Sequence, residues 1–97
     1  MYLTLYVSAK CPEVKVGYFG NDIKIETNVQ RWQHCAMQCA KYSSCKFWTW
    51  RDNTKYCFLK DSDAGRTLSG ASDAVSGNKS CRGKLLVFSG DANKIIL

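Results

Sequence analysis

Six cysteines in a chain of 97 residues constrain the fold more than any other feature of this sequence. A domain of this size has room for one small hydrophobic core, and extracellular domains of this size commonly add disulfides to it. The cysteine count is even, and disulfides persist in oxidising compartments such as the secretory pathway and the extracellular space. We therefore expect three disulfides in a single secreted domain.

Zinc binding is the alternative use of these cysteines. Structural zinc sites take four ligands, usually supplied by closely spaced pairs. The sequence offers one close pair on a predicted helix, Cys35 and Cys39, and its only histidine is His34. This arrangement lacks the second pair of a zinc site. The sequence therefore favours disulfides and predicts no metal and no cofactor.

The charge of the chain bears on its partners. There are 14 lysines and arginines against 8 aspartates and glutamates, and the formal charge is +6. Such a charge favours encounters with anionic partners, among them sulfated glycans, acidic proteins and lipid head groups, although it also serves solubility alone. The basic residues are dispersed along the sequence, which disfavours nucleic acid as a partner. No apolar run is long enough to cross a bilayer, so no membrane insertion is expected.

The two ends of the sequence are expected to flank the domain. Residues 1–10 begin with a short apolar run that lacks the basic leader and cleavage site of a signal peptide, and they are expected to be a flank or an edge strand. Residues 82–97 return to apolar side chains after the last cysteine and are expected to be a flank, an edge strand or a linker. We therefore expect residues 11–81 to form the domain, as one module of a larger protein.

The segment from residue 27 onwards has the pattern of an amphipathic helix. Thr27 and Gln30 have the spacing of a capping box, which predicts that the helix begins there. Its apolar face carries Val29, Trp32, Cys35, Ala36, Cys39 and Ala40. The helix is expected to end near Tyr42. Cys35 and Cys39 then project from one face and can be joined to strands that pack against it.

Extended segments are predicted on both sides of this helix. Residues 13–26 alternate apolar and polar side chains around a turn at residues 20–22, which indicates two short strands or extended arms. Residues 45–50 and 55–60 are rich in aromatic side chains and flank a polar turn, which predicts a β-hairpin. Residues 61–80 are rich in glycine, serine and aspartate, and we expect a long loop there.

The order and spacing of the cysteines and their neighbours match a known family pattern. The chain contains Cys35-Ala36-x-x-Cys39, then Cys45-Lys46-Phe47-Trp48-Thr49-Trp50, then Cys57-Phe58-Leu59-Lys60, and finally Ser76-Gly77-x-x-x-Cys81. This pattern resembles the PAN/apple domain family. Within that family it looks most like the apple modules of apicomplexan microneme adhesins.

The resemblance implies an α+β fold in which one α-helix packs on a curved antiparallel β-sheet, stapled by three disulfides. It implies that the bridges join Cys11 with Cys81, Cys35 with Cys57, and Cys39 with Cys45. It also implies a secreted protein, stored in a microneme, that serves cell adhesion and host-cell invasion. Some coccidian apple modules bind galactose-type sugars, whereas other apple domains bind proteins or heparin.

The predicted hairpin is the first candidate for a ligand-binding surface. If Cys45 and Cys57 both point at the helix, strand alternation sends Phe47, Thr49 and Leu59 to the helix side. The opposite face then carries Lys46, Trp48, Trp50, Tyr56, Phe58 and Lys60. Aromatic rings with cationic edges suit a sugar ring or a protein hot spot. Alternatively, the terminal strands cover this face and make it part of the core, since two adjacent exposed tryptophans would form a large apolar patch.

The loop that follows the hairpin is the second candidate. Its polar side chains, Asp61, Asp63 and Arg66, can hydrogen-bond a glycan, or the segment can be a solvated turn. The two aspartates alone lack the remaining ligands of a calcium loop. Separately, Asn78 begins an Asn-Lys-Ser glycosylation sequon and is expected at the surface.

Catalysis is not expected. His34 adjoins a cysteine that is expected to be oxidised, and the sequence has no phosphate-binding glycine loop and no carboxylate pair of buried character. The sequence therefore predicts a recognition module that binds a host-cell protein or a partner in a secreted complex. A galactose-type lectin is the alternative, and a spacer without a ligand of its own is the third.

Overall fold

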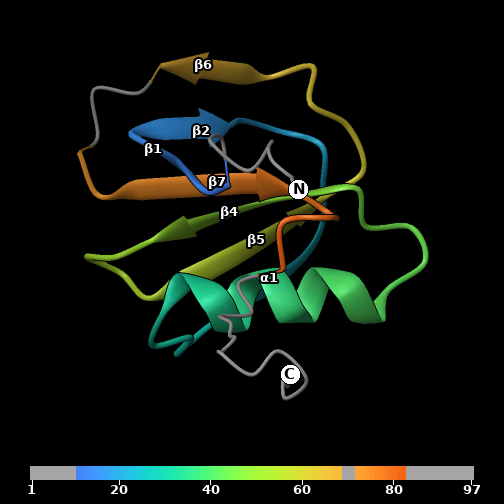
Figure 1. Ribbon diagram of the computed structural model, residues 1–97, viewed down its shortest axis with the longest axis horizontal. Coiled ribbons are helices and arrows are strands. Elements are labelled where there is room, and N and C mark those ends of the chain that lie inside the picture. The colour runs from blue at the N-terminus through green and yellow to red at the C-terminus, as the bar shows by residue number, and fades with distance from the viewer. Residues whose placement is uncertain (1–10, 69–71, 83–97) are drawn as a thin grey trace, which may run out of the picture.

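The computed structural model describes residues 11–68 and 72–82. The predictions for residues 1–10 and 83–97 lie outside the described residues. Within the described ranges, the helix α1 (Trp32–Lys41) covers one face of a five-stranded sheet, and a pair of short strands covers part of the other face (Figure 1). This arrangement confirms the α+β fold that the resemblance implies.

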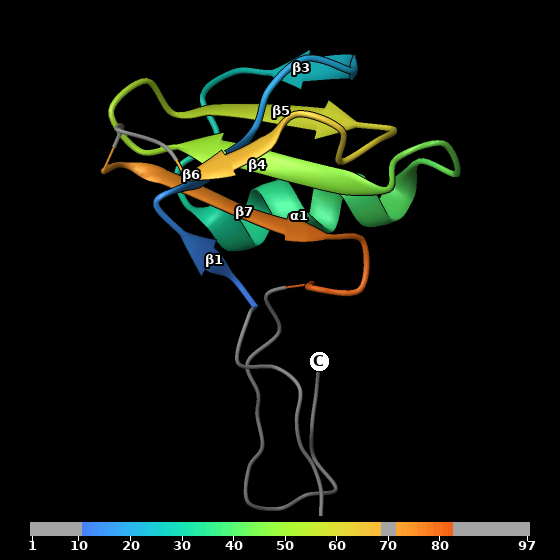
Figure 2. The ribbon, with the colours of Figure 1, turned by 90° about the horizontal axis from the view of Figure 1, so that it is seen from above.

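The five-stranded sheet is antiparallel and has the order β1-β7-β4-β5-β3 (Figure 2). Its strands are β1 (Glu13–Val14), β3 (Asp22–Glu26), β4 (Phe47–Arg51), β5 (Tyr56–Lys60) and β7 (Ala74–Asn78). The two remaining strands, β2 (Val16–Tyr18) and β6 (Arg66–Leu68), pair with each other. The predicted hairpin is confirmed, because β4 and β5 are antiparallel neighbours.

The extended segment at residues 13–26 forms three strands, and each pairs with a distant part of the chain. β1, β2 and β3 pair with β7, β6 and β5, respectively. Between β2 and β3 the chain reverses at Gly20 and Asn21, which both have positive φ, in agreement with the predicted turn. The segment therefore runs from one edge of the sheet, over its face, to the other edge.

The helix begins later than the capping box at residues 27–30 predicts. Its N-cap is Arg31, which makes no side-chain capping bond. The prediction is wrong because the hairpin holds this segment: the Val29 N–H donates to Lys55 O at 2.8 Å, and the Val29 carbonyl accepts from Trp50 Nε1 at 2.7 Å. These tertiary hydrogen bonds keep Val29 out of the helix. The end of the helix agrees with the prediction.

The predicted loop at residues 61–80 is wrong, because this segment supplies β6 and β7. β7 is an interior strand between β1 and β4. Its Ser76 is fully buried, and the hydroxyl donates to Val16 O at 2.5 Å and lies 2.8 Å from Thr49 Oγ1. A small polar residue that is typical of loops is thus tolerated inside the sheet, because its hydrogen bonds are made.

The hydrophobic core lies between α1 and the sheet. Its buried members are Val29, Cys35, Ala36, Cys39, Cys45, Trp48, Trp50, Cys57, Leu59 and Cys81. Disulfides join Cys35 to Cys57, Cys39 to Cys45, and Cys11 to Cys81, which are the same pairs that the resemblance implies. The first two tie α1 to β5 and to the chain before β4, so the covalent framework runs through the core.

Gly77→Ala is expected to destabilise the domain by about 1–3 kcal/mol through overpacking. A Cβ at Gly77 would lie 2.7 Å from Trp48 Cζ2 and 3.0 Å from Cys81 Cβ, and both neighbours are buried. Chemical denaturation followed by circular dichroism measures the change. Gly17→Ala is the control, because its Cβ would meet the tip of the exposed Phe19 ring at 2.9 Å and that ring is free to swing away. Equal losses in the two variants would contradict this account.

Candidate functional site

The hairpin buries the two tryptophans that were predicted on its face away from α1, here called the open face. Trp48 and Trp50 are 0% and 6% exposed and pack in the core beneath α1. In the hairpin register Trp50 lies opposite Cys57 and Trp48 opposite Leu59, so all four side chains share the helix side. The predicted placement of Leu59 is right, and that of the two tryptophans is wrong.

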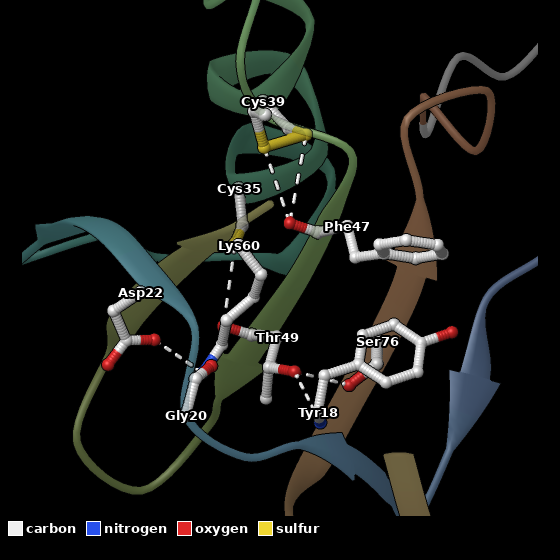
Figure 3. Close-up of polar contacts among 10 residues, drawn as sticks. Tyr18, Gly20, Asp22, Cys35, Cys39, Phe47, Thr49, Lys60 and Ser76 are labelled. Atoms are coloured by element: carbon white, nitrogen blue, oxygen red, sulfur yellow. Dashed lines mark hydrogen bonds and ion pairs between the residues drawn. A yellow bond between two sulfur atoms is a disulfide. The ribbon is translucent and has the colours of Figure 1, made fainter. Parts of the chain in front are cut away.

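Phe47 and Thr49 face away from α1, contrary to the prediction. The Phe47 ring packs edge-on against Tyr18 with ring centroids 5.1 Å apart, and the Tyr18 N–H donates to Thr49 Oγ1 at 3.0 Å (Figure 3). The prediction failed because β4 begins at Phe47, so Cys45 lies outside the strand. The direction of Cys45 therefore does not set the alternation of β4.

Three of the other predicted hairpin residues, Lys46, Tyr56 and Phe58, lie outside the core. Tyr56 is 40% exposed, and its ring lies 6.0 Å from the ring of Phe58. Phe58 is half-buried and lies opposite Thr49, on the face away from α1. Lys46 is exposed, and its backbone links Lys60 O to Lys79 N. The structure thus separates the predicted set into the core tryptophans, the rings of Tyr56 and Phe58 on the face away from α1, and the exposed Lys46.

A hollow of about 190 Å³ lies on this open face of the sheet. It is lined by Tyr18, Phe19, Gly20, Asp22, Thr49, Arg51, Phe58 and Lys60. Phe19, which lies in the turn between β2 and β3, is 49% exposed. The hollow therefore combines aromatic rings with charged groups of both signs, and it is the best candidate for a functional site in the described structure.

Lys60 forms one wall of the hollow and is itself buried. Its ammonium forms an ion pair with Asp22 and donates to Gly20 O at 3.1 Å (Figure 3). The ammonium also lies 5.2 Å from the centroid of the Phe58 ring. Such partners offset the cost of removing a charge from water. Lys60 thereby anchors the turn that carries Phe19.

Internal hydrogen bonds occupy the polar floor of the hollow. The Ser76 hydroxyl donates to Val16 O, so its one proton is in use. Thr49 must then be the donor in the bond between the two hydroxyls. Thr49 Oγ1 also accepts from the Tyr18 N–H. Its proton is therefore not available to a ligand.

Arg51 is held at the rim of the hollow by Asp73. Nε donates to Asp73 Oδ2 at 3.1 Å and Nη2 donates to Asp73 Oδ1 at 3.0 Å, which is a bidentate geometry. The Asn53 N–H also donates to Asp73 Oδ2, at 3.2 Å. The hydrogen bonds from Arg51 lower the pKa of Asp73 below its usual value, so the carboxylate stays charged at neutral pH. The hollow is therefore lined on one side by the Arg51 guanidinium, whose orientation is fixed by Asp73.

The second predicted surface, at residues 61–66, does not line the hollow. Ser62 Oγ accepts from the Ala64 N–H at 3.0 Å, and the Arg66 N–H donates to Asp63 O at 2.9 Å, which makes this segment a local turn. Asp61 and Asp63 are exposed. Among the described residues, no three His, Cys, Asp or Glu side chains gather closely enough to hold a metal ion.

Arg66 turns away from this loop and joins β6 to β1. Its guanidinium forms an ion pair with Glu13, whose Oε1 also accepts from the Tyr18 hydroxyl at 2.7 Å. Burial raises the pKa of Tyr18, and the hydrogen bond to Glu13 raises it further, so the phenol keeps its proton. Arg66 therefore ties β6 to β1, and the ligand contact predicted for it stays a prediction.

Asn78 is exposed at the end of β7. Its Oδ1 accepts from the Cys81 N–H at 3.1 Å, and its carbonyl accepts from Trp48 Nε1 at 3.1 Å. Glycosylation of this residue stays a prediction.

Sequence reasoning missed six of the eight residues that line the hollow, among them Phe19, Asp22 and Arg51. They come from different strands and turns, and the sheet order brings them to Phe58 and Lys60. One local indication was available, since Phe19 directly precedes the predicted turn and side chains beside tight turns are commonly exposed. No local pattern marks Asp22 or Arg51.

Comparison with known proteins assigns the family. The family model described as the PAN domain matches residues 11–83, a range that contains all six cysteines. The chain belongs to the PAN domain family. The match confirms the resemblance drawn from the cysteine pattern. PAN domains are an adhesion-type family and not a family of enzymes.

Solved structures resemble this PAN module as well. A PAN module from Eimeria tenella matches with a TM-score of 0.55 and 28% identity, covering 87% of this chain and 92% of that chain. The two N-terminal apple domains of Toxoplasma gondii microneme protein 4 match with a TM-score of 0.49 and 18% identity, covering 77% of this chain and 45% of that chain. No curated protein sequence matches this chain significantly.

The disulfides of this PAN module are those of a secreted or extracellular protein. Among the residues described, no helix has the length and apolar character needed to cross a bilayer.

Proposed function

We propose that this PAN module binds a protein, either a receptor on a host cell or a partner in a secreted complex, through the face opposite α1. The observation that carries the proposal is the hollow with the rings of Phe19 and Phe58 beside the anchored charges of Lys60 and Arg51. The exposed ring of Tyr56 adjoins Phe58 on the same face. Aromatic and arginine side chains dominate binding hot spots between proteins. Storage in a microneme before release is part of this proposal.

The hydrogen-bonding state of the hollow favours a protein over a sugar. A sugar needs several unengaged donors and acceptors for its hydroxyls, in addition to a ring on which to stack. Here Lys60 is engaged with Asp22, Arg51 with Asp73, and the Thr49 proton with a neighbouring hydroxyl. The remaining surface is largely aromatic, which suits the apolar anchor residue of a protein partner.

A galactose-type glycan is the second candidate ligand for the same hollow. It is supported by Asp22, whose partly exposed carboxylate lies in the lining with the rings of Phe19 and Phe58. An acceptor next to an aromatic face is a workable site for a sugar ring. The two candidates predict different binding behaviour, so one set of measurements separates them.

Binding of the disulfide-intact chain to cultured epithelial cells tests the proposal. Labelled protein is measured by flow cytometry on untreated cells, on protease-treated cells and on glycosidase-treated cells. Binding that is lost after protease and kept after glycosidase supports a protein receptor. Retention on galactose-agarose with release by free galactose supports the lectin instead. A heparin-type interaction is recognised by elution with salt, because salt screens exposed charges.

Phe58→Ala is expected to weaken cell binding by about 10- to 100-fold, the range of a hot-spot residue. Gly17→Ala tests the same face by another route, because its methyl group displaces the Phe19 ring and leaves the core untouched. The matched control is His34→Ala, on the exposed side of α1. Unchanged binding by Phe58→Ala, with the fold verified by circular dichroism, would show that this face is not the site.

A further inference from the structure

β3 (Asp22–Glu26) is an edge strand of the five-stranded sheet (Figure 2). It pairs with β5 on one side, and no other described strand pairs with its outer side. Its side chains are largely exposed, including Ile23 and Ile25, of which Ile25 is 48% exposed. An exposed edge with β-branched side chains is a template for pairing with another strand.

The backbone of β3 presents hydrogen-bonding groups to the outside at Ile25. The Asp61 N–H donates to Asn21 O, so at this position the chain of β5 directs its backbone groups toward β3. Backbone groups alternate in direction along a strand, so every second residue of β5 directs its N–H and C=O toward β3. The partners of these residues, Lys24 and Glu26, direct their own N–H and C=O toward β5. Ile25 lies between these two partners. Its N–H and C=O therefore point away from β5, at the open edge.

The side chains of β3 divide between the two faces of the sheet. Ile25 lies opposite Phe58 and shares the side of the hollow. Lys24 lies opposite Leu59 on the helix side, where its ammonium is 6.0 Å from the centroid of an aromatic ring. Glu26, two residues along, shares that side. The edge thus presents an apolar residue between a positive and a negative one.

We propose that this edge pairs with the same edge of a second copy of the chain. In the antiparallel register centred on Ile25, the outward backbone groups of Ile25 in the two copies bond to each other, and Lys24 of each copy lies opposite Glu26 of the other. The register centred on Lys24 would place lysine against lysine and Asp22 against Glu26. The register centred on Ile23 falls on the irregularity between Asp22 and Lys24. Charge and backbone direction together select the Ile25-centred register.

This pairing has a geometric consequence. Its two-fold axis is perpendicular to the sheet, so the two copies form one continuous sheet with both hollows on the same side. Such a dimer is bivalent toward a surface that carries several partner molecules, and bivalency raises the apparent affinity without new contacts. Edge pairing needs β3 alone, and it stands whether the hollow binds a protein, a glycan or nothing.

Sedimentation equilibrium of the disulfide-intact chain, from about 10 µM to about 1 mM, tests the proposal. We expect a reversible monomer–dimer equilibrium. Lys24→Glu places glutamate opposite glutamate at two symmetric positions and is expected to weaken the dimer at least tenfold, since like charges oppose association. Glu26→Lys is expected to do the same. The double variant, with both charges exchanged, restores opposite charges and is expected to recover the dimer.

Two further variants separate edge pairing from other causes. Ile25→Pro removes the outward N–H, a change that edge strands tolerate, and is expected to give a folded monomer. Lys41→Glu makes the same charge change at the end of α1 and is expected to leave the dimer intact. A chain that stays monomeric at about 1 mM, or a dimer equally strong in Lys24→Glu, overturns the proposal.

Discussion

Replacing Trp48 with alanine is expected to lower the free energy of unfolding by about 3–5 kcal/mol, a large part of the roughly 5–15 kcal/mol that stabilises a domain. Trp48 is fully buried and stacks on Trp32, with ring centroids 5.7 Å apart and planes at 6°. Its Nε1 donates to Asn78 O and Cys81 O, each at 3.1 Å. The substitution removes packing from α1 and β7 together. Guanidinium denaturation followed by circular dichroism gives the value.

Tyr56→Ala is the matched control for this prediction. Strand alternation counted from Cys45 and Cys57 predicts that Trp48 and Tyr56 share one face, whereas the structure buries the first and leaves the second 40% exposed. Removal of an exposed side chain is expected to change stability by about 0.5 kcal/mol or less. Trp48→Phe keeps most of the packing and loses the donor, so its loss is expected to be intermediate. Similar losses for Trp48→Ala and Tyr56→Ala would contradict the burial of Trp48.

Removing the disulfide between Cys35 and Cys57 is expected to cost about 2–5 kcal/mol and to lower the melting temperature steeply. The bridge joins α1 to β5, both cysteines are fully buried, and their sequence separation is 22. Loop-closure entropy alone amounts to about 3.4 kcal/mol for a loop of this length. The double substitution to alanine avoids a free thiol that would exchange with the other bridges. Thermal melts under non-reducing conditions measure the effect.

The bridge between Cys39 and Cys45 provides the comparison. Its sequence separation is 6, and the same loop-closure estimate is about 2.4 kcal/mol. The double alanine substitution of this pair is therefore expected to be the milder of the two. A larger loss here than for Cys35 and Cys57 would contradict the account based on loop length. Complete reduction is expected to unfold the domain, because it removes all three constraints.

Strand alternation predicts the direction of the hairpin side chains correctly in one strand and wrongly in the other. In β5, Cys57 lies inside a regular strand, so alternation from Cys57 correctly separates Leu59 from Phe58. The same argument fails in β4, because Cys45 precedes the regular strand and carries no information on its parity. The pairing of Trp50 with Cys57 across the turn is the correct guide, and it depends on the length of the hairpin turn.

The sequence by itself was sufficient to recognise the PAN family, the α+β fold and the hairpin. These features depend on cysteine spacing and strand alternation, which are patterns among residues that are close in the sequence. Long-range packing set the rest. Val29 stays outside the helix because its hydrogen bonds run to the hairpin, and Ser76 lies in an interior strand because Val16 and Thr49 meet its hydroxyl. The hollow itself arises where distant strands meet Phe58, and a local sequence window cannot contain partners that far apart.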